Sequence, residues 1–181
     1  MKFRFNLGKT LQAAGLLLGL DENRMDRIRL LKLLYIADRE LLAEVGRPLT
    51  GDTPVAMKYG PVPSKVYDLI KEVPGRTSEW SQFISSTDYS VVLQNDPGKG
   101  KLSKREIEKL KEITDRYRGL DDFDLSELTH QFPEWVTHYT TDTSTPIPWE
   151  EILRAQGKGQ LAEVIERDEA AARYLDDLFG K

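Results

Sequence analysis

The chain has 181 residues, of which 39% are hydrophobic and 31% charged, and these values fit one globular domain with at most a short appended segment. The sequence contains no Cys, which excludes thiolate zinc sites, disulfide frameworks and Cys nucleophiles and agrees with a reducing cytoplasm. The net charge of −4 is uneven: residues 1–76 carry 13 Lys and Arg against 9 Asp and Glu (+4), and residues 77–181 carry 13 against 21 (−8). This asymmetry could steer a charged partner toward the protein. Because no block of five or six like charges occurs, the favoured interpretation is that both halves have ordinary surfaces of mixed charge.

Two helices are predicted in the first 45 residues. The first covers 6–20, with Asn6 as its N-cap and apolar residues at spacings of three and four. A polar turn at 21–24 leads to the second, which covers 25–45, has a wide apolar face and ends at Gly46. The apolar run before the turn is only about eight residues long and no cleavage site follows it, so we expect neither a signal peptide nor a membrane span.

The middle of the chain mixes turns, a hairpin and helices. The run Tyr59–Pro63 contains two prolines and predicts a turn, after which a helix begins near Pro63 or Ser64 and ends by Val73. Residues 80–93 are rich in β-prone types around a polar turn, which indicates a small hairpin. A capping box that begins at Ser103 then opens a helix over 104–117.

The last third is again helical. Short helices are predicted over 125–131 and 133–140, followed by a polar connection over 140–148, a helical segment that begins at 149, a break at Gly157 and Gly159, and a final helix over 161–178. The fold class is therefore α+β and mainly helical: a single compact domain with a small β-hairpin and a C-terminal helix.

Residues of the usual catalytic and metal sites are scarce. His130 and His138 are the only histidines, and their separation of eight fits no zinc motif. No Gly-x-Ser-x-Gly sequence frames a serine. We therefore expect no catalytic residue, no cofactor and no metal.

Two stretches are unusual for generic packing. The first is LLKLLYIADRELL (30–42) with GRPLTGDTPVAMKYGPVPSKVYDLIK (46–71), and the second is LSELTHQFPEWVTHY (125–139). Together they resemble the Panacea domain, the SocA-like antitoxin domain of bacterial and phage toxin–antitoxin systems. The resemblance implies a domain over 1–155, whereas 156–181 lies beyond it and is predicted from its own pattern as an amphipathic acidic helix, packed on the domain or extending it.

The resemblance also implies a cytoplasmic protein that neutralises a toxin encoded beside it by direct binding. Family members are paired with unrelated toxins, and some are thought to deliver the toxin to a cellular protease as adaptors. Two other functions remain open. A DNA-binding autoregulator would use the two N-terminal helices as a helix-turn-helix, although the pI of about 5.4 disfavours nucleic acid. An enzyme would need a site built from His130, Tyr67 and a carboxylate, which no spacing supports.

Six residues are candidates for partner contact: Tyr59, Tyr67, His130, Trp135, His138 and Arg39. Each has a structural alternative, which the residue patterns favour. Tyr59 and Tyr67 fit a rigid corner that docks a hairpin on a helix, and the His130, Trp135 and His138 group fits a cap on the core. Lys32 and Arg39 either join a buried polar network centred on Tyr35 or lie along the surface, and the surface position is preferred.

Overall fold

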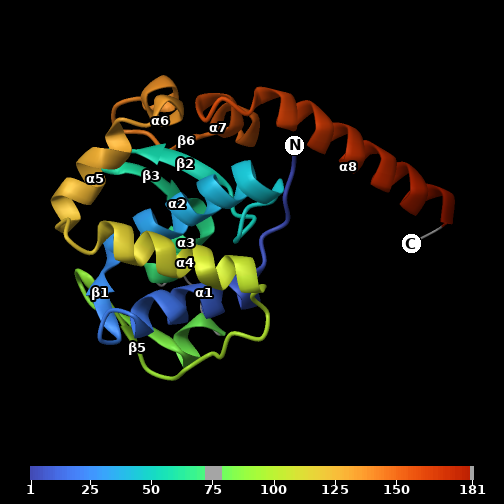
Figure 1. The fold of residues 1–181 in the computed structure, drawn as a ribbon. Helices are drawn as coiled ribbons and strands as arrows, with labels where there is room; N and C mark the ends of the chain where they lie inside the picture. The colour runs from blue at the N-terminus through green and yellow to red at the C-terminus, as the bar shows by residue number, and fades with distance from the viewer. Residues whose placement is uncertain (72–78, 180–181) are drawn as a thin grey trace.

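The computed structural model describes residues 1–71 and 79–179, and within them the fold is mainly helical (Figure 1). The helices are α1 (Leu7–Gly19), α2 (Arg27–Val45), α3 (Ser64–Ile70), α4 (Lys104–Tyr117), α5 (Asp122–His130), α6 (Pro133–His138), α7 (Trp149–Ala155) and α8 (Gly159–Phe179), with a 3-10 turn at Trp80–Gln82. The strands are β1 (Arg24–Asp26), β2 (Pro54–Met57), β3 (Gly60–Pro63), β4 (Ile84–Ser86), β5 (Ser90–Leu93) and β6 (Thr145–Pro146). The predicted α+β class is confirmed.

Helix α2 lies at the centre of the molecule, between α1 and α4 on one side and the β2–β3 hairpin on the other (Figure 1). The side chain of Asp26 caps its first turn by accepting a hydrogen bond from the Ile28 amide. Gly46 ends it with φ of 73°, a left-handed conformation that favours glycine. The predicted central helix and its stop are therefore confirmed, but its predicted start at residue 25 is wrong, because the helix begins at Arg27.

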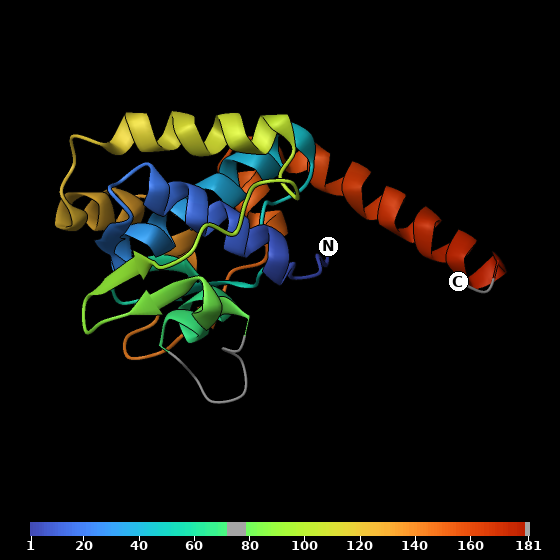
Figure 2. The same ribbon diagram turned by 90° about the horizontal axis from the view of Figure 1, so that it is seen from below.

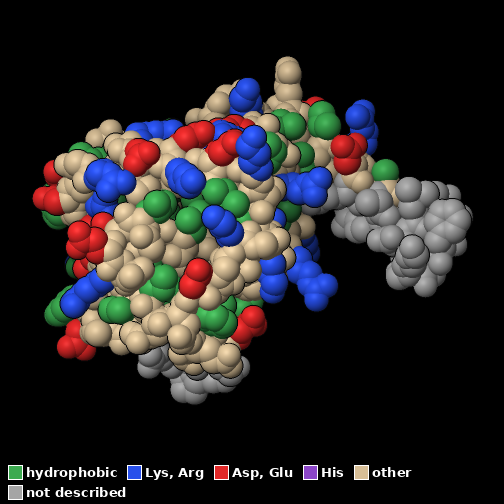
Figure 3. All heavy atoms as spheres, turned by 60° about the horizontal axis from the view of Figure 1, so that its bottom comes forward, with side chains coloured by type: hydrophobic (Ala, Val, Ile, Leu, Met, Phe, Trp, Pro, Cys, Tyr) green, Lys and Arg blue, Asp and Glu red, His purple; other side chains and the backbone are tan. Residues whose placement is uncertain are grey.

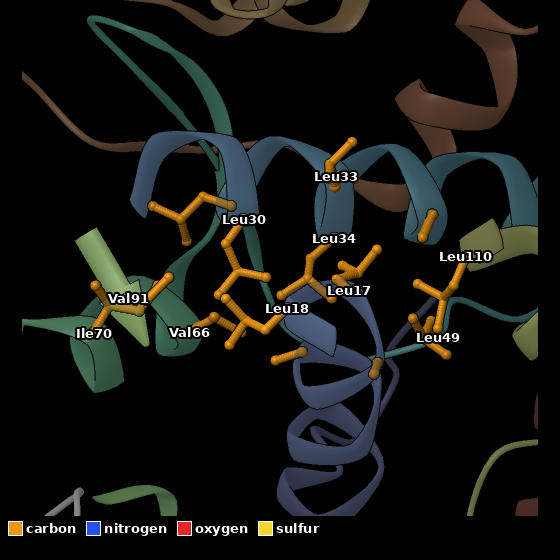
Figure 4. Packing of buried hydrophobic residues seen from close by; sticks show 14 of the residues in the cluster. Leu17, Leu18, Leu30, Leu33, Leu34, Leu49, Val66, Ile70, Val91 and Leu110 are labelled. Carbon is orange, nitrogen blue, oxygen red and sulfur yellow. The ribbon is translucent and has the colours of Figure 1, made fainter. Parts of the chain in front are cut away.

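Leucine side chains from α1 and α2 form much of the core. Leu17 and Leu18 of α1 face Leu30 and Leu34 of α2 (Figure 4), and all four are fully buried. Full burial of one such side chain is worth about 1.5–3 kcal/mol relative to leaving it in water. The two apolar faces predicted from spacing are thus the ones that meet.

Helix α4 packs on α2 through apolar and ionic contacts. Leu110 and Ile113 are buried, and the Lys109 ammonium lies 2.8 Å from a Glu40 carboxylate oxygen and 2.5 Å from one of Glu44. The capping box at Ser103 is present as predicted. On the face shown in Figure 3, Lys and Arg are interspersed with Asp and Glu, which fits the expected mixed surface on that face.

The expected hairpin of residues 80–93 is present as β4 and β5, and β1 adds a third antiparallel strand in the order β1-β5-β4. Arg24 was assigned to a polar turn, and that assignment is wrong because the strand Arg24–Asp26 pairs with Ser90–Val92. The turn predicted over Tyr59–Pro63 needs the same correction. Gly60–Pro63 is the edge strand of a second antiparallel sheet, β3-β2-β6, where a missing proline amide is tolerated.

Helix α8 leaves the body of the molecule after its first turns (Figure 2). Leu161, Ala162 and Ile165 pack in a second apolar cluster that contains Phe3 and Trp149. This helix begins at Gly159, two residues before the predicted start. The division of the chain at residue 155 stays a prediction. The end predicted at residue 73 for the helix that begins near Ser64 lies outside the described residues.

Candidate functional site

The β2–β3 hairpin turns at Lys58 and Tyr59 and rests against α2 and α5. The Ser126 hydroxyl of α5 donates a 2.8 Å hydrogen bond to the Tyr59 carbonyl. Gly60 has φ of 94°, and a Cβ atom there would clash with the Thr129 hydroxyl and lie 2.7 Å from the Lys32 ammonium nitrogen. Only glycine therefore allows this close approach of the hairpin to both helices.

Lys32 is completely buried beneath the hairpin, so the expectation that it lies along the surface is wrong. Its Nζ donates a 2.9 Å hydrogen bond to the carbonyl of Pro61. Burial lowers the pKa of Lys32 to about 7. Lys32 therefore links α2 to β3 through this hydrogen bond.

Tyr35 and Arg39 of α2 share one carboxylate, that of Glu134 in α6. The Tyr35 hydroxyl donates to Glu134 Oε1 at 2.9 Å, and Arg39 Nε donates to the same oxygen at 2.6 Å. Burial, together with the Glu134 charge, raises the pKa of Tyr35 well above its usual value. The buried-network alternative is thus correct for Tyr35 and Arg39, and Glu134 is a site residue that sequence reasoning missed although its Pro-Glu-Trp run was noted.

A second polar cluster joins α2 to the segment before β2. Asp38 accepts hydrogen bonds from the amide and the hydroxyl of Thr50, at 2.7 and 2.5 Å, and burial raises the pKa of Asp38 to about 7. Asp52 accepts from the amides of Thr53 and Val66, at 2.7 and 3.0 Å, and so positions the first turn of α3. These carboxylates hold backbone in place.

A small cavity of about 170 Å³ opens between α2, the hairpin and α3. Tyr59 and Tyr67 both line it, together with Ile28, Leu31 and Lys32 of α2. Tyr59 is 59% exposed, whereas Tyr67 is half-buried. The structure thus brings these two sequence candidates to one opening.

The remaining aromatic candidates form a stack beside the hairpin. The His130 and Trp135 rings lie with centroids 4.3 Å apart, and Trp135 lies 4.7 Å from Tyr139. Trp135 Nε1 donates a 2.9 Å hydrogen bond to the Met57 carbonyl, which ties the stack to β2. His138 instead places Nδ1 2.9 Å from the carbonyl of Glu134 in its own helix.

The geometry disfavours the DNA-binding and enzyme alternatives. Helix α2 is buried along most of its length, so it cannot enter a major groove as a recognition helix. Arg29 is already bound to the carbonyls of Tyr117 and Leu120, at 2.7 and 2.9 Å. His130 does not line the cavity that Tyr67 lines. Among the side chains that the structure describes, no three His, Asp or Glu are grouped to hold a metal ion, and no helix in the described part of the chain is long and apolar enough to cross a membrane.

The fold and this site define a mainly helical α+β domain with an aromatic surface and a frame of buried polar residues, namely Lys32, Tyr35, Asp38, Asp52 and Glu134. The model of the family described as antitoxin SocA-like, Panacea domain, matches residues 30–136, which is more than half of the chain. The chain therefore belongs to this family. The comparisons of this chain with curated protein sequences and with solved structures find no match. The matched range contains all of the buried frame and both tyrosines of the cavity.

Proposed function

We propose that the protein is an antitoxin that neutralises a toxin by direct protein–protein binding. The observation that carries this proposal is the pair of tyrosines at the cavity, which lie inside the family-matched range. Tyr59 lies at the turn of a hairpin that Ser126 holds through a hydrogen bond, and Tyr67 lies in α3. Tyrosines are frequent at binding hot spots because a ring with two rotatable bonds loses little entropy when it is buried.

The toxin is expected to be the product of a neighbouring gene in a bacterium, phage or prophage, and the complex would then form in the cytoplasm. The contact surface would include Tyr59 and Tyr67 and extend to the exposed edge of the stack at Trp135. Arg39 and His138 support this surface through their bonds to Glu134 and carry less of the contact. The proposal includes a second step, in which the antitoxin acts as an adaptor that delivers the bound toxin to a cellular protease. This step requires the same complex and would shorten the lifetime of the toxin.

Co-expression with each adjacent small open reading frame tests the proposal. Growth rescue and co-purification are scored together, first with the intact chain. The Tyr59→Ala and Tyr67→Ala variants are each expected to weaken the complex about tenfold to a hundredfold, which corresponds to roughly 1.4–2.8 kcal/mol.

Tyr89→Ala is the matched control for these variants, because Tyr89 is 72% exposed and lies beside the other sheet. It is expected to leave rescue and binding unchanged. If the intact chain rescues no neighbour and binds none, the antitoxin proposal is wrong. If all three tyrosine variants behave alike, the proposed surface is wrong.

A further inference from the structure

The cavity under Tyr59 and Tyr67 is too small for a typical cofactor or metabolite. Its volume of about 170 Å³ lies below the roughly 300–1,000 Å³ of small-molecule sites, so it can hold about one side chain. Its walls include Ile28, Leu31 and Met57, which offer an apolar lining. The shape and lining therefore suit a single apolar anchor from another protein.

The surroundings of this cavity are basic. Lys58 Nζ lies 5.5 Å from the centre of the Tyr59 ring, and Lys71 Nζ lies 4.5 Å from the centre of the Tyr67 ring. Both lysines are exposed, and among the described residues no Asp or Glu lines the cavity. From 54 to 71 the chain carries three lysines and one aspartate.

We propose that the cavity receives one apolar side chain, of about leucine size, from an acidic segment of the partner whose carboxylates pair with Lys58 and Lys71. The inference rests on the proposed function and adds the chemistry of the partner. The apolar anchor supplies affinity by leaving water, and the flanking carboxylates supply selectivity and faster association. Both lysines already lie over aromatic rings, so less rotamer freedom is lost when a carboxylate binds.

Three synthetic peptides separate the two parts of this recognition. The probes are acetyl-Glu-Asp-Leu-Asp-Glu-amide, the same peptide with Gly in place of Leu, and acetyl-Lys-Lys-Leu-Lys-Lys-amide. Binding to the full chain is followed by NMR through the methyl groups of Ile28, Leu31 and Met57, which lie in the cavity wall. The acidic leucine peptide is expected to shift these signals saturably and at least about tenfold more tightly than either of the others.

Charge reversal then tests the lysines. Lys58→Glu with Lys71→Glu is expected to weaken the acidic leucine peptide at least about tenfold. Lys104→Glu with Lys111→Glu changes the net charge equally at two exposed positions of α4 and is expected to have little effect. Equal weakening by both double variants would overturn the carboxylate pairing, and equal binding of the leucine and glycine peptides would overturn the apolar anchor.

The peptide experiment and the toxin experiment fail separately. If no peptide shifts the cavity methyl groups while the intact chain still binds and neutralises a toxin, the cavity inference is wrong and the antitoxin proposal stands. If the acidic leucine peptide binds as expected while no neighbouring protein is bound or neutralised, the antitoxin proposal is wrong and the cavity remains a site for acidic segments.

Discussion

Replacing Glu134 by alanine tests whether buried bonds hold α6 on α2. Glu134 is 2% exposed, and its carboxylate accepts from both Tyr35 and Arg39. In Glu134→Ala the tyrosine hydroxyl and the guanidinium group lose their shared acceptor at a position that water reaches poorly. The substitution therefore leaves a charge and a donor unpaired inside the protein, which is the most damaging way to break a polar contact.

The expected loss of unfolding free energy is about 3 kcal/mol. Breaking a buried ion pair by removing one partner costs about 3–5 kcal/mol, and the lower end applies because the Arg39 side chain retains 15% exposure. Glu134→Gln keeps one acceptor oxygen for the Tyr35 hydroxyl but removes the negative charge and one acceptor, so about 1–2 kcal/mol is expected. Glu163→Ala, at an exposed position of α8, is the control and should change stability by less than about 0.5 kcal/mol.

Equilibrium unfolding in urea, followed by circular dichroism, measures these losses. A double-mutant cycle that combines Glu134→Gln with Arg39→Met isolates the pair and is expected to give a coupling of about 1–3 kcal/mol. A loss below about 1 kcal/mol for Glu134→Ala with an unchanged urea dependence, or a coupling near zero, would refute the argument that this carboxylate holds α6 in place.

Three further outcomes are expected. Gly60→Ala should lower the melting temperature by at least about 4 °C, because the positive φ and the clash together cost about 2 kcal/mol or more, whereas Gly100→Ala, with open space around it, should change it little. Since the pKa of Lys32 falls from 10.5 to about 7 on folding, the folded chain binds fewer protons than the unfolded chain between these pH values. The free energy of unfolding, measured in urea, should therefore rise by roughly 2 kcal/mol from pH 7 to 9, and Lys32→Met should lack this rise. A chain that ends at Asp168 should keep the wild-type melting temperature, while one that ends at Gly157 should lose several degrees, because Leu161, Ala162 and Ile165 in the first turns of α8 pack on the body.

The helices could be predicted because their signals are local. Asn6, Ser103 and Gly46 mark helix ends by hydrogen bonds or conformations within a few residues, and apolar spacing gives the buried face. The strand β1 could not be predicted in this way. Its three residues are too few to establish a strand period, and it exists because Arg24–Asp26 pairs with residues 64–68 positions later.

The candidate site shows the same limit. The spacing of Lys32, Tyr35 and Arg39 was sufficient to suggest a polar network, because residues three and four apart share a helix face. Their acceptors, however, are the Pro61 carbonyl, 29 positions away, and the Glu134 carboxylate, 99 positions from Tyr35. Without those distant partners a charged side chain has a lower free energy at the surface than in the interior. The burial of Lys32 was therefore not predictable from the helix alone.

The polar and aromatic residues of the two motif stretches have different physical roles. Lys32, Tyr35 and Glu134 hold α2, the hairpin and α6 in one arrangement, while Tyr59 and Tyr67 stay open at the cavity. A buried, satisfied network fixes geometry, and a fixed surface loses less entropy when a partner binds. We therefore expect substitutions in the frame to act through stability and those around the cavity through partner binding.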